Sequence, residues 1–100
     1  MALVKVAKAG EIAEGSGKTV QAQGKVLALF RQGGKFYCID NTCLHKQGPL
    51  AEGDLDGTTI TCPMHGWQYN VTTGENTSPG GGRVNSYKTQ VQGEDVLVEI

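Results

Sequence analysis

The chain has 100 residues, with nine basic and ten acidic side chains and a formal net charge of −1, a size that suits one domain with one hydrophobic core. Because neither sign of charge dominates, the composition argues against a nucleic-acid partner. No apolar run approaches the ~18 residues of a membrane-spanning helix, and residues 1–8 alternate apolar and basic side chains, so we expect neither a signal peptide nor a membrane partner.

Apolar and β-branched residues fall in short runs separated by glycine, which is typical of an all-β protein. Residues 11–14, between Gly10 and Gly15, admit at most one helical turn. In chain order we expect strands over 26–30, 35–39, 58–62, 67–71, 84–91 and 95–100, with turns at Gly33-Gly34, Gly57, Gly74 and Gly93. The predicted fold is an antiparallel β sandwich or a barrel-like stack.

Three stretches lack strand character, namely 41–54, 63–66 and the glycine-rich 76–82. Both histidines of the chain belong to the first two: Cys43-Leu44-His45 lies in one loop, and Cys62-Pro63-Met64-His65 opens the next. Thiolate and imidazole are the ligands that transition metals prefer. The spacing therefore predicts a metal site made of Cys43, His45, Cys62 and His65.

Two kinds of metal centre fit two cysteines and two histidines. Structural zinc usually takes its ligands from Cys–Cys and His–His pairs, whereas each pair here is mixed. Mixed pairs suit a binuclear iron–sulfur cluster, in which one iron takes both thiolates and the other takes both imidazoles. Neutral imidazoles also leave such a cluster less negative than four thiolates would, so it accepts an electron more readily. A structural zinc module that mediates protein contacts remains the alternative.

Over nearly its whole length the chain resembles the Rieske family, and within it the small ferredoxins that feed electrons to bacterial ring-hydroxylating oxygenases. Besides the four ligands, the similar positions are Asn41, Pro49-Leu50, Gly53, the hairpin around Gly57, and Ser78-Pro79-Gly80. The resemblance implies a 2Fe-2S cluster whose buried iron is bound by Cys43 and Cys62 and whose outer iron is bound by His45 and His65. It also implies a cluster-binding subdomain, about residues 40–82, inserted into the β sandwich.

Departures from respiratory Rieske proteins favour the soluble ferredoxin branch. Gly48 and Met64 stand where those proteins have a loop disulfide, and Trp67 stands where they have a serine that bonds to the cluster. Fewer hydrogen-bond donors to the sulfurs make reduction harder, so we expect a potential near about −150 mV rather than about +300 mV. Gln47 also replaces a glycine found in many relatives.

The function implied is electron transfer from a flavin- or iron-sulfur-containing reductase to a terminal oxygenase or another oxidoreductase. We expect an electron carrier that is monomeric, has no catalytic residues and binds no organic substrate. Three cysteines are too few for a disulfide scaffold. Because proteins of the reducing cytoplasm usually lack disulfides, we expect the protein to be cytoplasmic. A small subunit of a multisubunit oxidoreductase such as a nitrite reductase is the alternative within the same fold.

Six further side chains have plain structural interpretations, and some of them have a functional one as well. Cys38, in the middle of a predicted strand, is expected to be a buried thiol without a role. Trp67 could shield the cluster, belong to the core, or both, and Tyr69 could donate a hydrogen bond to a ligand sulfur or simply pack. Lys46 could contact an acidic partner or be solvated. Asp54 and Asp56 are expected to be turn residues.

Overall fold

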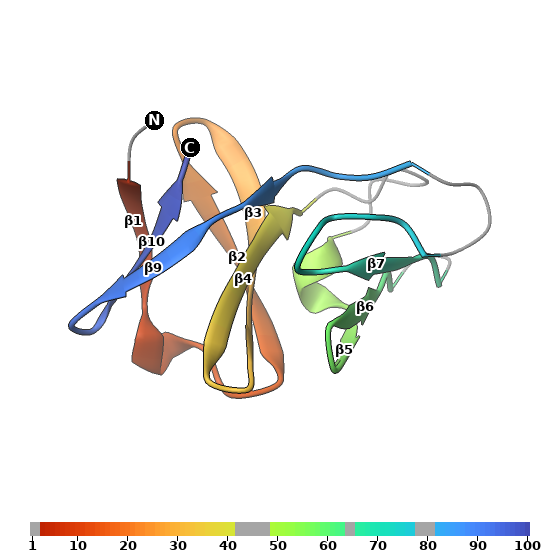
Figure 1. Ribbon diagram of the computed structural model, residues 1–100, viewed down its shortest axis with the longest axis horizontal. Coiled ribbons are helices and arrows are strands. Elements are labelled where there is room, and N and C mark those ends of the chain that lie inside the picture. The colour runs from red at the N-terminus through yellow and green to blue at the C-terminus, as the bar shows by residue number, and fades with distance from the viewer. Residues whose placement is uncertain (1–2, 42–48, 64–65, 78–81) are drawn as a thin grey trace.

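The computed structural model describes residues 3–41, 49–63, 66–77 and 82–100. Across these residues the chain forms ten strands and two short 3-10 turns (Figure 1). In chain order they are β1 (Leu3–Lys8), η1 (Ala9–Glu11), β2 (Ser16–Ala22), β3 (Lys25–Gln32), β4 (Lys35–Asp40), η2 (Leu50–Glu52), β5 (Asp54–Asp56), β6 (Thr59–Thr61), β7 (Gln68–Asn70), β8 (Ser86–Tyr87), β9 (Thr89–Gln92) and β10 (Asp95–Glu99).

The described strands form three antiparallel sheets, with strand orders β1-β10-β9, β2-β3-β4-β8 and β5-β6-β7. The β5-β6-β7 sheet has strands of only three residues each and is here called the small sheet; the other two are called the larger sheets. Figure 1 shows the larger sheets together and the small sheet beside them at one end of the molecule. The predicted all-β, antiparallel fold is confirmed. The small sheet lies within the predicted cluster-binding subdomain, whose boundaries at 40 and 82 stay a prediction.

Two sequence predictions about strands were wrong in detail. The run expected over 84–91 is divided at Lys88, because β8 pairs with β4 whereas β9 pairs with β10, so the chain changes sheet at that residue. Asp54 and Asp56, expected in turns, belong to β5 and pair with β6. Their carboxylates are exposed, which lets an edge strand carry charge, and the turn begins only at Gly57, whose φ is 60°.

Three further strands, β1, β2 and β5, lie outside the predicted runs. By contrast, the predicted glycine turns are confirmed, since Gly33, Gly34, Gly57, Gly74 and Gly93 all have positive φ. Residues 11–14, for which at most one helical turn was predicted, contribute only Glu11, the last residue of η1. A further tight turn, at Gln23-Gly24, joins β2 to β3 with both residues at positive φ.

The described apolar residues pack into two clusters. The cluster between the larger sheets includes Leu27, Leu29, Val96 and Val98, all fully buried. The second cluster, here called the site cluster, consists of Ala28, Phe30, Ile39, Leu50, Ala51, Ile60, Cys62, Tyr69, Val71 and Val84. It joins β3 and β4 to η2 and the small sheet. No helix in the described parts of the chain has both the length and the apolar character needed to cross a membrane.

Candidate metal centre

Cys62 is the predicted ligand that the structure describes, and it lies directly after β6. Its backbone N–H donates to the Trp67 carbonyl at 2.7 Å, and the Gly66 N–H donates to the Cys62 carbonyl at 3.1 Å. Gly66 has a φ of 76°, a conformation that glycine adopts without strain. These bonds close a short turn between β6 and β7, so Cys62 is held at the end of a paired strand.

The ends of the first predicted ligand loop meet at Asn41. Its backbone carbonyl accepts a hydrogen bond from Leu50 N–H at 2.8 Å, and its side-chain oxygen accepts one from Ala51 N–H at 2.9 Å. Asn41 is the one buried polar residue among those described, and a buried amide that lost these partners would carry a desolvation cost. Asn41, one of the positions at which the sequence is similar to the Rieske family, therefore fixes the base of the first ligand loop.

A third segment is tied to the same sheet as Cys62. Thr77 N–H donates to the Gln68 carbonyl of β7 at 2.8 Å, and Asn76 N–H donates to the Gly82 carbonyl at 3.0 Å. Val84 N–H donates to the Gly74 carbonyl at 2.8 Å, and the buried Val84 side chain belongs to the site cluster. The chain on both sides of residues 78–81 is thus fixed against β7 and the site cluster.

The other three predicted ligands, Cys43, His45 and His65, lie outside the described residues, as do Lys46, Gln47, Gly48, Met64 and the Ser78-Pro79-Gly80 segment. Within the described ranges no group of three or more His, Cys, Asp or Glu side chains could hold a metal ion. The four-residue ligand set therefore stays a prediction.

The surroundings of Cys62 fit a thiolate ligand of a 2Fe-2S cluster. The residue is only 2% exposed and packs in the site cluster with Leu50 and Ala51, which directly follow the first ligand loop. Apolar cover of this kind limits solvent access and so tunes the potential of an iron–sulfur centre. Cys62 is also three residues from the imidazole of His65 in the sequence, which keeps a sulfur and a nitrogen donor on one short segment.

Cys38 differs from Cys62 in its neighbours and in its acidity. It is 1% exposed and belongs to the cluster between the larger sheets. Burial, with a smaller effect from the Asp40 carboxylate, raises the pKa of the Cys38 thiol to about 12. The thiol is therefore protonated at neutral pH and is no thiolate ligand. The predicted buried thiol is confirmed.

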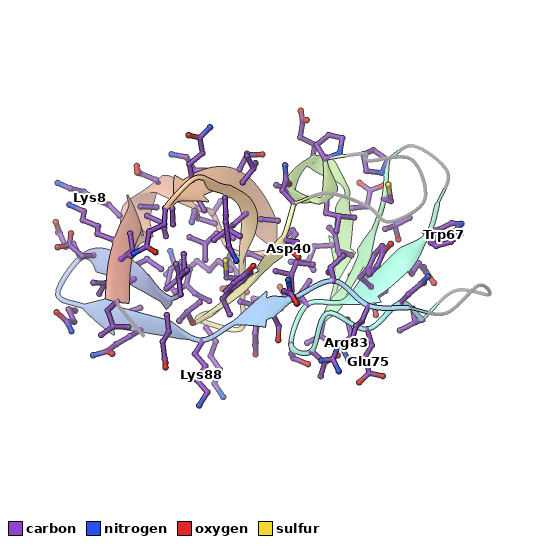
Figure 2. The ribbon with its side chains drawn as sticks, turned by 90° about the horizontal axis from the view of Figure 1, so that it is seen from above. Lys8, Asp40, Trp67, Glu75, Arg83 and Lys88 are labelled. Carbon is purple, nitrogen blue, oxygen red and sulfur yellow. The ribbon has the colours of Figure 1, made fainter. Side chains whose placement is uncertain are left out.

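Trp67, which directly precedes β7, and Tyr69, which lies within it, differ in burial. Tyr69 is fully buried and belongs to the site cluster together with Cys62, while Trp67 is half-buried and packs against that cluster. Figure 2 shows Trp67 at the outer end of the small sheet. The packing role of both is confirmed, and a hydrogen bond from Tyr69 to a ligand sulfur stays a prediction.

Sequence reasoning missed one group of polar side chains near the candidate site. The Asp40 carboxylate accepts hydrogen bonds from the Tyr87 hydroxyl and from the Asn85 N–H, 47 and 45 residues away in the chain. Asp40 directly precedes Asn41, which closes the first loop. No local spacing indicates such a contact, because the two partners meet only through the β4–β8 pairing.

Comparisons with known proteins agree with this arrangement. A model of the Rieske [2Fe-2S] domain matches residues 2–88. The ferredoxin component of the naphthalene 1,2-dioxygenase system of Pseudomonas aeruginosa is 33% identical over 91 residues, 90% of this chain and 88% of that protein.

Solved structures show the same similarity in three dimensions. The ferredoxin of carbazole 1,9a-dioxygenase from Nocardioides aromaticivorans superposes with a TM-score of 0.92 at 29% identity, covering 98% of this chain and 97% of that one. A chain in the complex of reduced oxygenase and oxidised ferredoxin in carbazole 1,9a-dioxygenase superposes with a TM-score of 0.87 at 36% identity, covering 96% and 91%.

Proposed function

The chain belongs to the Rieske [2Fe-2S] domain family, and we propose that it is a ferredoxin that accepts single electrons from a reductase and delivers them to a terminal oxygenase. The resemblance that the sequence indicated is confirmed, and with it the 2Fe-2S cluster as cofactor. The protein is an electron carrier, as its relatives are, and not a catalytic subunit.

One observation carries the choice of partner. The chain matches ferredoxin components over almost the whole of both lengths, and a chain similar to it has been solved in complex with its oxygenase. The relatives that it matches are named as ferredoxin components, separate from the oxygenase that does the catalysis. Its chemistry therefore ends in handing an electron to another protein.

We assign Cys43 and Cys62 to one iron of the cluster and His45 and His65 to the other. When bound, the cluster would supply one-electron redox chemistry. The buried position of Cys62 supports its place on the buried side. The residues 40–82 would form the cluster-binding subdomain. Within it, Asn41 holds the base of the first ligand loop, and the turn from Cys62 to Trp67 presents the second loop.

The cytoplasm is the proposed compartment, and the potential is proposed to lie near the negative end of the Rieske range. Cys38 is a buried thiol not joined in a disulfide, which suits a reducing environment. The low potential is supported by Trp67 in place of the bonding serine and by Gly48 and Met64 in place of a bridge. Such a potential suits a nicotinamide-linked reductase as the electron donor.

Metal and sulfide analysis of anaerobically purified protein tests this proposal. About two irons and two acid-labile sulfides per chain are expected, with uptake of one electron per chain during a reductive titration. Cys62→Ala should abolish the visible spectrum, because it removes one of four protein ligands. Zinc without sulfide, or a full visible spectrum in Cys62→Ala, would contradict it, and a midpoint well above zero would contradict the low potential.

A further inference from the structure

The side chain of Asp40 connects two distant parts of the chain beside the metal centre. One carboxylate oxygen accepts a hydrogen bond from the Tyr87 hydroxyl at 2.7 Å, and the other accepts one from the Asn85 N–H at 3.0 Å. The Asp40 N–H donates to the Asn85 carbonyl at 3.0 Å. Figure 2 places Asp40 at the junction of the larger sheets and the small sheet.

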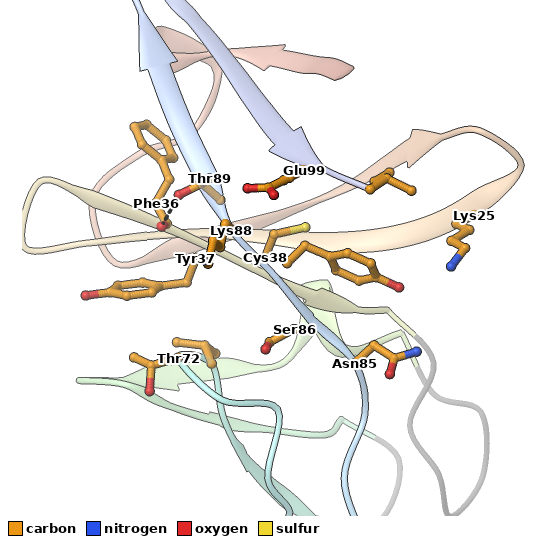
Figure 3. Close-up of a pocket in the computed structure, with 13 residues that line it drawn as sticks. Lys25, Phe36, Tyr37, Cys38, Thr72, Asn85, Ser86, Lys88, Thr89 and Glu99 are labelled. Atoms are coloured by element: carbon orange, nitrogen blue, oxygen red, sulfur yellow. Dashed lines mark hydrogen bonds between the residues drawn. The ribbon is translucent and has the colours of Figure 1, made fainter. Parts of the chain in front are cut away.

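These bonds reinforce a pairing that is otherwise very short. β8 has only two residues, and its pairs with β4 are Cys38 with Tyr87 and Ile39 with Ser86. Strands in globular proteins usually have about five or six residues, so two pairs alone hold β8 weakly. The Asp40 bonds extend the contact beyond the end of the ladder, where Asn85 lies beside β4 (Figure 3).

Each partner in this contact leads directly to a segment of the metal centre. Asp40 is followed by Asn41, where the ends of the first ligand loop meet. Asn85 is preceded by Val84, which is fixed to Gly74 and buried in the site cluster with Cys62. The contact therefore sets the distance between the chain that enters the first ligand loop and the chain that returns from residues 78–81.

The environment of Tyr87 keeps its hydroxyl a donor. Burial, followed by the hydrogen bond to Asp40, raises the pKa of Tyr87 to about 12, so the hydroxyl holds its proton at neutral pH. The Lys25 ammonium lies 5.7 Å from the centre of the Tyr87 ring, within the range of a cation–π interaction. Tyr87 therefore stays a proton donor to Asp40, and its ring has a second contact in the Lys25 ammonium.

We propose that Asp40 and Tyr87 are positioning residues of the metal centre, which tie the first ligand loop to the segment before β8 and thereby set the reduction potential. The proposal rests on the proposed function, since it concerns the same cluster. A loop that moves relative to the sulfurs loses hydrogen-bond donors, and fewer donors make reduction harder. Loosening this contact should therefore lower the potential.

The sign of the effect separates positioning from simple charge. Removing a negative charge near the cluster favours the added electron and raises the potential by Coulomb attraction. Asp40→Asn removes the charge, but its amide can still accept from Asn85 N–H and donate to the Tyr87 oxygen. Asp40→Ala removes both the charge and the hydrogen bonds. Positioning predicts a lower potential for Asp40→Ala than for Asp40→Asn, whereas charge alone predicts the same potential for both.

The experiment measures midpoint potentials and hydrogen exchange on the cluster-loaded protein. Tyr87→Phe, which changes no charge, should lower the potential and speed amide exchange at residues 85–87 about tenfold or more, the effect of losing one hydrogen bond to a charged group. Asp40→Asn should restore most of the exchange protection that Asp40→Ala loses. Visible spectra and iron content should stay those of the wild type, because no ligand is changed.

Two matched controls remove similar contacts elsewhere. Thr89→Val removes the 2.7 Å hydroxyl bond to the Phe36 carbonyl, drawn in Figure 3, and Glu14→Ala removes carboxylate bonds to the N–H groups of Gly33 and Gly34. Neither should shift the potential.

Equal potentials for Asp40→Ala and Asp40→Asn, or a wild-type potential in Tyr87→Phe, would overturn the proposal. Absence of iron and sulfide from the wild type would instead defeat the proposed function, so the two failures are distinguishable.

Discussion

At the scale of single residues, Cys38 and Cys62 are almost equally buried but have different neighbours. Cys62 stands at the end of a strand in the site cluster, next to residues that follow the first ligand loop. Cys38 stands within β4, paired with Leu29 and Tyr87, in the other cluster. Burial is common to both, so their roles are set by what each side chain can reach.

Replacement of Cys38 by serine should separate folding stability from metal binding. The hydroxyl would enter an apolar cluster, and burying it without a good partner costs about 1–3 kcal/mol. We therefore expect Cys38→Ser to lower the urea midpoint while iron content and visible spectrum stay unchanged. Loss of the spectrum from folded Cys38→Ser would mean that this thiol holds iron.

The raised pKa of Cys38 predicts a loss of stability in alkali. The unfolded thiol deprotonates near its ordinary pKa of 9.0, but the folded thiol does so only near about 12. Between these values the unfolded state binds fewer protons, so the stabilising contribution present below about pH 9 is lost as the pH rises toward 12. Urea unfolding at pH 8 and pH 10 should show a larger loss for the wild type than for Cys38→Ala. Equal losses would show that the folded thiol titrates normally.

At the scale of elements, the sequence predicted β3 and β10, whose apolar side chains are largely buried, and missed β2, most of whose side chains are exposed. β3 and β10 carry continuous or alternating buried apolar residues, such as Leu27–Phe30 and Val96 with Val98. β2 buries only Val20 and Ala22, and it is a strand because seven residues pair with β3. Its pattern is set by the partner strand, which local periodicity does not contain.

The candidate site was predictable for a different reason. Metal ligands recur at short spacings because one loop must aim two donors at one cluster, so Cys62 and His65 stand out in the sequence. The contact of Asp40 with Tyr87 joins residues 47 positions apart. Only the chain path through β4 and β8 brings them together, and a single sequence does not encode that path in any local pattern.

Close backbone approach makes Gly53 a sensitive position between η2 and β6. A Cβ atom there would lie 2.0 Å from the Thr61 carbonyl oxygen, although the φ of −78° suits any residue. Gly53→Ala should therefore push Thr61, the last residue of β6 and the neighbour of Cys62, away from residue 53. We expect this to cost about 1–3 kcal/mol or more, with partial loss of iron. Gly10→Ala is the control, because nothing lies within 4 Å of its added methyl. Similar midpoints for both variants in urea would contradict this packing.

At the scale of the whole molecule, a net charge of −1 conceals a strong separation of charge. Residues 40–82 contain five acidic side chains and one basic one, a net charge of −4, while the rest of the chain has eight basic and five acidic side chains, a net charge of +3. Glu52, Asp54, Asp56 and Glu75 are exposed. Figure 2 shows Glu75 beside the small sheet and both Lys8 and Lys88 on the larger sheets.

This separation predicts the charge of the molecules that exchange electrons fastest with the cluster. Residues 40–82 include all four predicted ligands, and reduction adds one more negative charge to that end. A cationic small-molecule oxidant should therefore react faster with the reduced protein than an anionic one of similar driving force, and added salt should slow the first and speed the second. Stopped-flow oxidation at several ionic strengths measures both trends.

Neutralising Glu52 and Asp54 together, as Glu52→Gln with Asp54→Asn, should reduce the salt dependence of the cationic reaction several-fold. These two exposed carboxylates supply half of the net −4 charge of residues 40–82. Glu94→Gln is the matched control, because Glu94 is an exposed carboxylate in the turn between β9 and β10, on the larger sheets. This variant should leave the salt dependence nearly unchanged, because exposed charges beyond a Debye length of about 10 Å are screened at ~0.1 M salt. Identical salt slopes for the cationic and anionic oxidants would show that electrons leave through a neutral surface. An effect of Glu94→Gln as large as that of the double variant would show that the whole charge of the protein, and not its acidic end, governs the encounter.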